Sequence, residues 1–366
     1  MNAMMTERQR LLTVLKGGEP DILPWYAELS QLYYAMGERG ERPQKYDGDE
    51  GYLEFHKDLG AGVYCYSPFM FKPHHPQFTE TRKDGYLYRE YVTDIGSVDS
   101  KHKYMTESFC YARIKYFVES AEDMRVMQRV CEQTSYTDNY DEYKKIDVLW
   151  GGHGTPVSMF LGWVSPLQVM MAAWCGVQKT TEIIYDYPDE FDEFFKVASA
   201  SQDAAFEIIA NSPAEVVQFQ ENLSSEVTGR TLFQKYNAPL YKKRVNFLHK
   251  YGKKVGIHID GTLKPCLGML EECGFDYAEA VTPSPVGDVE PEDLRRLAGD
   301  TVIFGGLPGT IFSPVCSERS FSEHLDRVLN IFCTGKGYVL GVADQVPSDA
   351  IWERVAEVRR RLEKFY

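Results

Sequence analysis

Two residues that can bind protons or metal ions lie close together in the segment KKVGIHIDG, which spans Lys253–Gly261. The apolar run Val255–Ile257 is typical of a buried parallel strand, and it leads directly into His258 and Asp260. Side chains two positions apart in a strand project from the same face, so these two are expected to lie side by side. In the alternative, structural interpretation, His258 packs in the core and Asp260 caps a helix that starts near Leu263.

Other predicted strands end in polar side chains in the same way. The sequence GGHGTP follows one predicted strand, ENLSS follows another, and VADQVP follows the last. Because the carboxyl ends of barrel strands share one mouth, we expect these side chains to meet there. The candidate residues are His153, Glu221, Asn222, His258, Asp260, Asp344 and Gln345. Structural alternatives stay open: a backbone-bonded loop position for His153, a helix start for Glu221, and a turn cap for Asp344.

Two kinds of chemistry use an imidazole together with carboxylates. In the first, a His nitrogen and carboxylate oxygens hold Zn²⁺ or another divalent ion, which polarises a substrate oxygen as a Lewis acid. In the second, a carboxylate in an aromatic pocket transfers protons or stabilises positive charge on a ring substrate. The spacing of the candidate residues is compatible with both.

The elements that position these residues alternate between strand and helix. Strands are predicted at Ile22–Tyr26, Val63–Tyr66, Val148–Trp150, Glu215–Gln220, Val255–Ile259, Tyr277–Glu279, Thr301–Phe304 and Tyr338–Gly341. Helices are predicted between the later strands, beginning with Ser165–Trp174, and a last helix at Ser348–Phe365 closes the chain. This repeat predicts the α/β class and a single (β/α)₈ TIM barrel. No G-x-G-x-x-G motif follows the first strand, which argues against a dinucleotide-binding fold.

The N-terminal third carries a different pattern. The alternating sequence YLYREYV, flanked by Asp84-Gly85 and Ile95-Gly96, predicts an antiparallel hairpin over one face of the main fold. We therefore expect one domain over residues 1–366. Residues 1–140 would include a helical and hairpin extension that forms a lid, and residues 146–366 the regular repeats. This third is rich in aromatic residues, and we predict that Trp25 and Tyr64 bind substrate.

Composition argues against several classes of partner. The chain of 366 residues has a formal net charge of −14 and an isoelectric point of about 5.1, which disfavours nucleic acid and anionic membranes. No apolar run approaches the roughly 18 residues that cross a bilayer. The eight cysteines form no C-x-x-C pair, which indicates reduced thiols and a cytoplasmic protein.

The order of GGHGTP, QENLSSEVTG, HIDG, LEECGFDYAEA, GDTVIFGGLPGT and GYVLGVADQVP resembles the uroporphyrinogen decarboxylase superfamily, from about Thr6 to the end of the chain. The resemblance implies a single (β/α)₈ barrel. True decarboxylases of this superfamily carry arginines after the first strand that bind the substrate carboxylates. Here the matching stretch is Trp25–Ser30, which contains no arginine, and Ala343 stands where those enzymes have a histidine. A polyanionic substrate therefore fits this chain poorly.

The other branch of the superfamily contains corrinoid-dependent methyltransferases, which hold zinc through a His-x-Cys motif and a later cysteine. At those positions this chain has His258, Asp260 and Ala343, so its site is richer in oxygen ligands. The segments Asp58–Tyr66 and Ala343–Pro347 are similar to members associated with O-demethylation of methoxylated aromatics.

The resemblance thus implies a methyltransferase that moves a methyl group from a small, methoxylated aromatic donor to a corrinoid protein. Zn²⁺ would be held by His258 and Glu221, and the corrinoid would stay on the partner. Glu221, Asp260 and Asp344 are the predicted catalytic residues, and His153, Asn222 and Gln345 are predicted to bind substrate. A lyase acting on a tetrapyrrole or an aromatic acid is the alternative, followed by a non-catalytic binding protein. The oligomeric state stays open, with a homodimer among the possibilities.

Overall fold

The structure is a computed structural model that describes residues 4–64, 70–159, 164–333 and 335–366. Its centre is a parallel sheet of seven strands in the order β1-β13-β12-β11-β10-β9-β8. The strands are β1 (Trp25–Tyr26), β8 (Val157–Met159), β9 (Val216–Leu223), β10 (Lys254–Ile259), β11 (Tyr277–Val281), β12 (Val302–Pro308) and β13 (Tyr338–Ala343). Parallel bridges join Tyr26 to Gly62 and Val63 to Gly154. The segment around Gly62 and Val63 therefore fills the eighth strand position and closes the ring, which confirms the (β/α)₈ barrel.

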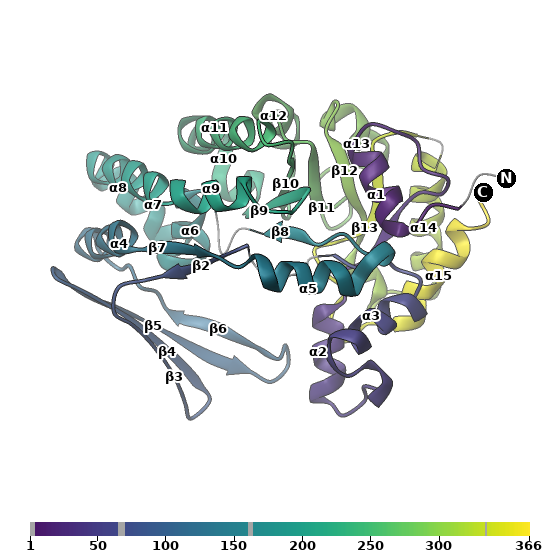
Figure 1. Cartoon of the computed structure of the whole chain (residues 1–366), viewed down its shortest axis with the longest axis horizontal. Helices are drawn as coiled ribbons and strands as arrows, with labels where there is room; N and C mark the ends of the chain where they lie inside the picture. Colours follow the sequence, from purple (N-terminus) through teal and green to yellow (C-terminus); the bar gives the residue numbers. More distant parts are fainter. Residues whose placement is uncertain (1–3, 65–69, 160–163, 334) are drawn as a thin grey trace.

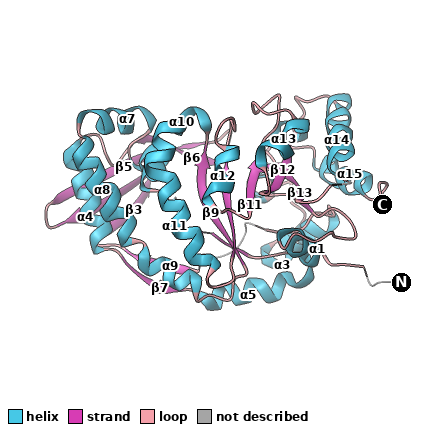
Figure 2. Cartoon of the chain, turned by 90° about the horizontal axis from the view of Figure 1, so that it is seen from above, coloured by secondary structure: helices cyan, strands magenta, loops and turns pink. Residues whose placement is uncertain are grey.

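Helices lie outside the ring of strands, along its sides and at its amino end (Figures 1 and 2). They are α1 (Glu7–Leu15), α2 (Ser30–Glu38), α3 (Gly48–Asp58), α5 (Tyr140–Trp150), α6 (Pro166–Val169), α7 (Val177–Asp186), α8 (Pro188–Ser201), α9 (Asp203–Ala210), α10 (Ser225–Leu232), α11 (Ala238–His249), α12 (Leu267–Cys273), α13 (Pro291–Ala298), α14 (Glu318–Phe332) and α15 (Trp352–Leu362). Among the described helices, none has the length and apolar character that crossing a bilayer demands.

Helix α1 closes the amino-terminal end of the barrel. A capping box fixes its start, because the Thr6 hydroxyl accepts from the backbone N–H of Gln9 and the Gln9 side chain accepts from the N–H of Thr6. Leu11, Val14 and Leu15 are buried against barrel side chains from the amino ends of the strands. The opposite, carboxyl end of the barrel is left for loops.

The N-terminal extension forms a separate antiparallel sheet (Figure 1). Strands β3 (Phe78–Lys83), β4 (Tyr86–Thr93), β5 (Gly96–Met105) and β6 (Cys110–Lys115) follow one another as a meander, and β2 (Phe71–His74) pairs with β7 (Ser135–Asp138). Asp84 and Gly85 both have positive φ, as a tight two-residue hairpin turn requires. Helix α4 (Ala121–Gln133) packs on this sheet and on α8, around a core distinct from that of the barrel. The predicted hairpin is confirmed as part of a larger sheet.

The predicted strand at Val148–Trp150 is wrong, because these residues form the last turn of α5. Tyr143 and Trp150 face the core from one side of this helix, whereas Val148 is exposed. The short apolar run is therefore the end of an amphipathic helix, and the strand of this repeat is β8, which follows GGHGTP. The prediction of a strand at Val63–Tyr66 falls partly on Cys65 and Tyr66, which lie outside the described residues.

Candidate active site

The carboxyl end of the barrel brings together an imidazole and several carboxyl groups. His258 on β10 is opposite Glu279 on β11 in the parallel register, so both side chains project at the same level. The Nδ1 atom of His258 lies 2.6 Å from Oε2 of Glu279, and both residues are buried. Its Nε2 atom lies 4.0 Å from Oδ2 of Asp260 and 3.9 Å from Oδ1 of Asp344. The prediction that His258, Asp260 and Asp344 meet is confirmed.

The charge state of His258 follows from this arrangement. Burial lowers the pKa of His258, but the charge and hydrogen bond of Glu279, together with Asp260 and Asp344, outweigh it and raise that pKa to about 9. The ring is therefore an imidazolium at neutral pH. Since Nδ1 bonds to Glu279, Nε2–H is the proton that faces Asp260 and Asp344.

Glu279 is itself held in place from inside the barrel. Its Oε1 atom accepts a hydrogen bond of 2.9 Å from the Tyr64 hydroxyl, and Oε2 accepts one of 2.9 Å from Nε2 of Gln218. The Tyr277 hydroxyl in turn donates to Oε1 of Gln218 over 3.1 Å. Tyr64 is fully buried and packs edge-on against Tyr26. Tyr64 thus acts as a support for Glu279, which differs from its predicted place in a substrate-binding wall.

A further carboxyl group, that of Glu28, lies close enough to sense these charges. Burial raises the pKa of Glu28 to about 7, against hydrogen bonds from Ser30, and the charges of Asp344 and Glu279 add to the rise. Burial also raises the pKa of Asp344, although the neighbouring His258 lowers it. Like charges hinder the ionisation of their neighbours, so Glu28 is a group beside this site that can hold a proton near neutral pH.

The backbone is strained where the strands end. Asn222, Ala280 and Asp344 have φ values of 46°, 63° and 63°, in the left-handed region that non-glycine residues rarely adopt. The pairing of β10 with β9 shifts register after His258, and the pairing of β11 with β12 shifts register after Glu279. Such bulges and strain cluster at functional sites, where they aim particular side chains.

A cavity of about 670 Å³ opens at this end of the barrel and includes Asp260, Asp344 and Gln345. Gln31 on α2 also lines it, and its amide donates to the carbonyl of Ser108, which ties the β5–β6 connection to the rim. Among the described residues that line this cavity there is no lysine or arginine. The lining of this cavity is therefore acidic. His258 is not itself a lining residue, but its Nε2 atom lies within about 4 Å of Asp260 and Asp344, which are.

Glu221 lies at this end of the barrel but faces another way. Its Oε1 atom accepts from the backbone N–H groups of Val164 and Ser165 at 2.6 and 2.9 Å, and its Oε2 accepts from the Tyr241 hydroxyl at 2.8 Å. Burial raises the pKa of Glu221 to about 8. Both oxygens thus fix helices α6 and α11 to the end of β9, and neither is directed at His258.

The predicted zinc ligands do not fit the donor geometry. Glu221 bonds elsewhere, and among the described residues no three His, Cys, Asp or Glu side chains are arranged to hold a metal ion.

Three predicted substrate-binding positions lie away from the cavity. His153 precedes β8, and its carbonyl accepts from Val63 N–H, which places it at the amino end of the barrel; its predicted place at the mouth is wrong. Trp25 is buried in the layer between strands and helices, so its predicted contact with substrate is also wrong. Asn222 is exposed at the end of β9 and does not line the cavity.

Sequence reasoning missed Glu279 and Glu28. An acidic residue inside the apolar strand Tyr277–Val281 was a usable signal, because a buried carboxylate needs specific partners. Glu28 follows the first strand just as Asp344 follows the last, and β1 and β13 are neighbours. The sequence alone does not show that β10 pairs with β11, and this pairing places His258 beside Glu279.

A closed (β/α)₈ barrel with a buried imidazole and acids at the carboxyl ends of its strands has the architecture of an enzyme. The chain belongs to the uroporphyrinogen decarboxylase (URO-D) family, whose model matches residues 113–365, more than half of the chain. No curated protein matches the chain.

Solved structures resemble the chain in fold. A methyltransferase from Methanosarcina mazei superposes with a TM-score of 0.64 at 13% identity, covering 99% of each chain. A putative vitamin-B12-independent methionine synthase from Listeria monocytogenes gives a TM-score of 0.43 at 10% identity, over 94% of this chain and 97% of that one. A type I 3-dehydroquinate dehydratase from Clostridium difficile gives 0.32 at 14% identity, over 68% and 79%. At 13% identity, the likeness to the Methanosarcina mazei methyltransferase shows the fold alone.

Proposed function

We propose that this protein is a methyltransferase that moves a methyl group from the oxygen of a small donor to the corrinoid of a partner protein. The observation that carries the proposal is the bond between His258 and Glu279, which leaves a protonated Nε2 facing Asp260 and Asp344 at the cavity. The URO-D family membership and the fold shared with a methyltransferase support it.

Methyl transfer from an ether oxygen requires a proton at the oxygen that loses its methyl group. When the partner is bound, its corrinoid supplies the nucleophile that takes the methyl group. The carbon–oxygen bond breaks, its electron pair stays on the oxygen, and the Nε2 proton of His258 neutralises that oxygen as it forms. Glu279 keeps the imidazole charged and oriented, and Asp260 and Asp344 lie beside the proton that moves.

The charge of the cavity restricts the donor. Asp260, Asp344 and Asp349 line it, and no described lysine or arginine is present to bind an anion. Burying a carboxylate among unneutralised carboxylates is costly, so a neutral methoxylated aromatic fits better than an aromatic acid or a tetrapyrrole polyanion. We also propose that the protein works in the cytoplasm, which the seven unpaired cysteines among the described residues support.

The test offers reduced free cobalamin as acceptor and guaiacol, a neutral methoxyarene, as donor, with vanillate as its carboxylate analogue. We expect methylcobalamin, measured by absorbance, to form faster from guaiacol than from vanillate. The variant His258→Gln should lose the reaction while remaining folded, which a cooperative thermal unfolding transition shows even where its midpoint is lowered. Transfer that His258→Gln leaves intact, or decarboxylation of uroporphyrinogen by the wild type, would contradict the proposal.

A further inference from the structure

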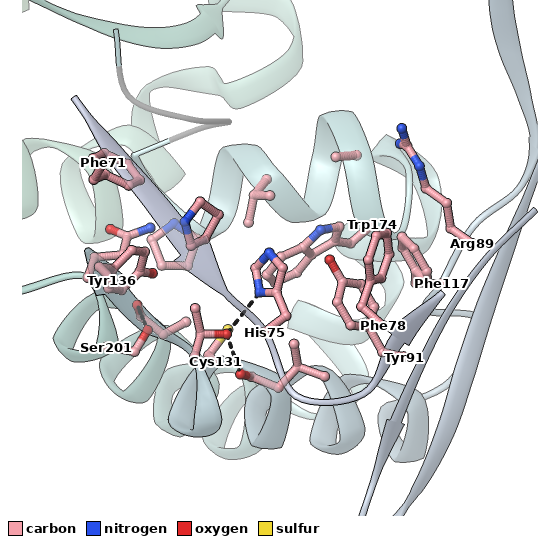
Figure 3. A pocket seen from close by; sticks show the side chains of 18 of the residues that line it. Phe71, His75, Phe78, Arg89, Tyr91, Phe117, Cys131, Tyr136, Trp174 and Ser201 are labelled. Carbon is pink, nitrogen blue, oxygen red and sulfur yellow. Dashed lines mark hydrogen bonds between the residues drawn. The ribbon is translucent and has the colours of Figure 1, made fainter. Parts of the chain in front are cut away.

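A second cavity, of about 480 Å³, lies between the N-terminal extension and helices α6 and α8 (Figure 3). Its walls come from the β3–β6 sheet, from β2 and β7, and from helices α4, α6 and α8 with the turn after α6. It has no lining residue in common with the cavity at the barrel mouth. A concave space of this size is typical of a site for a small molecule.

Aromatic rings form much of the wall. Figure 3 shows Phe78, Tyr91 and Phe117 gathered on one side, with Trp174 and His75 beside them. The Tyr91 ring centroid lies 4.7 Å from that of Phe78 and 5.2 Å from that of Phe117, so the rings support one another. His75 is fixed by a 3.0 Å hydrogen bond between Nδ1 and the Thr134 hydroxyl. Ring faces and edges of this kind bind a flat aromatic ligand.

The charged groups of this wall are all basic. Arg89 and Arg113 line the cavity, and no aspartate or glutamate is among its lining residues. Arg89 is neutralised by Glu80, at 2.8 Å from its Nε. His102 carries no charge at neutral pH, because burial and the nearby arginines lower its pKa to about 4.

Arg113 differs from Arg89 because it has no acidic partner. One Nη atom donates to the carbonyl of Ala172 over 2.6 Å, and the guanidinium lies 5.1 Å from the Tyr116 ring. Its Nε is buried without a hydrogen-bond partner. Burial lowers the pKa of Arg113, and no carboxylate of the described residues is among the groups that oppose this shift. A guanidinium stays charged in proteins, so a half-buried one without a counterion is a position where an anion would be stabilised.

We infer that this cavity binds an arene carboxylate, with its ring among Tyr91, Phe117 and Trp174 and its carboxylate on Arg113. A planar carboxylate matches the fork of a guanidinium, and the forked, charge-assisted bond is the strong kind. The site is independent of methyl transfer, because the cavity at the barrel mouth is acidic and lies elsewhere.

The experiment is isothermal titration of the purified full chain with 2-naphthoate and with its neutral analogue 2-naphthamide. We expect naphthoate to bind at least about tenfold more tightly than the amide, since a charge-assisted bond to Arg113 is lost with the amide. Arg113→Met should weaken naphthoate binding by about tenfold or more and leave amide binding nearly unchanged. Arg82→Met is the matched control, because Arg82 lies in the same sheet but outside the cavity, and it should bind like the wild type.

Two further variants locate the ligand. Ala173→Phe should fill the cavity and abolish binding of both compounds, since Ala173 is a buried lining residue. His258→Gln, at the barrel mouth, should bind naphthoate as the wild type does. Circular dichroism confirms that each variant is folded. Equal binding of naphthoate and naphthamide, unchanged affinity in folded Arg113→Met, or loss of binding in His258→Gln would each overturn the inference.

Discussion

The two cavities differ in whether their buried cation has a carboxylate partner within the chain. At the barrel mouth, the imidazolium of His258 has its counterion within the chain, because Glu279 lies 2.6 Å away. In the extension, the guanidinium of Arg113 is bonded to a carbonyl and faces only neutral or basic groups. Both cavities belong to one chain with a formal net charge of −14.

This difference indicates two different tasks. A cation with an internal carboxylate partner keeps its proton in a defined place and can deliver it to a substrate. A cation without one stabilises an anion that arrives from outside. Variants of His258 and Glu279, together with the naphthoate titration of Arg113→Met, test whether the two cavities divide these tasks.

The largest effect is expected at His258. Replacing it with glutamine removes the proton donor, so methyl transfer should fall by about 100-fold or more, the usual contribution of a general acid. Single-turnover kinetics with guaiacol measure it. Asn222→Ser, at an exposed strand end outside the cavity, is the control and should stay within about twofold of the wild type. A similar loss in both variants would contradict a specific role for His258.

Glu279→Gln should change the pH dependence of the reaction. Without that charge, the pKa of His258 falls from about 9 towards its ordinary value, and the alkaline limb of the rate profile moves to lower pH. At pH 8 the rate should drop by about tenfold or more, with a smaller loss at pH 6. A loss that is the same at both pH values would mean that Glu279 does not act through the His258 proton.

The same pair makes stability depend on pH. The folded pKa of His258 is raised, so its stabilising contribution is fully present below the unfolded pKa of about 6.5 and is lost as pH rises through about 9. The contribution is on the order of 3 kcal/mol. Urea unfolding of wild type and His258→Gln at pH 6 and pH 9.5 measures it. An equal change between the two pH values in both proteins would contradict it.

Glu221 should affect folding more than chemistry. Glu221→Ala leaves the N–H groups of Val164 and Ser165 and the Tyr241 hydroxyl without an acceptor, which should cost about 3 kcal/mol of unfolding free energy. Glu221→Gln keeps an acceptor, so we expect a loss of about 1 kcal/mol and a rate within about threefold of the wild type. A stable Glu221→Gln variant whose rate falls as far as that of His258→Gln would restore a catalytic role to Glu221.

The smallest effect is expected at Trp25. Its ring is buried on the outer side of the strands, so Trp25→Phe should lower the unfolding free energy by about 1 kcal/mol and leave kcat unchanged. A lowered kcat with unchanged stability would indicate contact with the substrate after all.

The sequence predicted the repeat of the barrel well where strands are buried on both faces. Strands β10, β12 and β13 are largely apolar and are followed by glycine or polar residues, and that pattern is local. Val148–Trp150 has the same local pattern but belongs to a helix whose apolar positions recur at helical spacing from Tyr143. Short apolar runs do not distinguish the two, and this one error moved His153 to the wrong end of the barrel.

For the site, sequence reasoning identified the side chains at the last residues of a strand or directly after it, His258, Asp260 and Asp344. The sequence predicted that the Glu221 side chain faces the mouth. The pairing of β9 with β10 shifts register near Glu221, and its side chain is turned outward there, but no local sequence pattern indicates such a shift. Sequence reasoning missed Glu279 because that role depends on pairing with a strand elsewhere in the chain.

The charge of the His258 imidazole is measured directly by NMR titration with ¹⁵N-labelled histidine, assigned through His258→Gln. We expect the imidazole to remain charged at pH 7.5 and to titrate near pH 9, and Glu279→Gln to move this pKa towards 6.5. A His258 that is already neutral at pH 7.5 in the wild type, or one whose pKa is indifferent to Glu279→Gln, would contradict it.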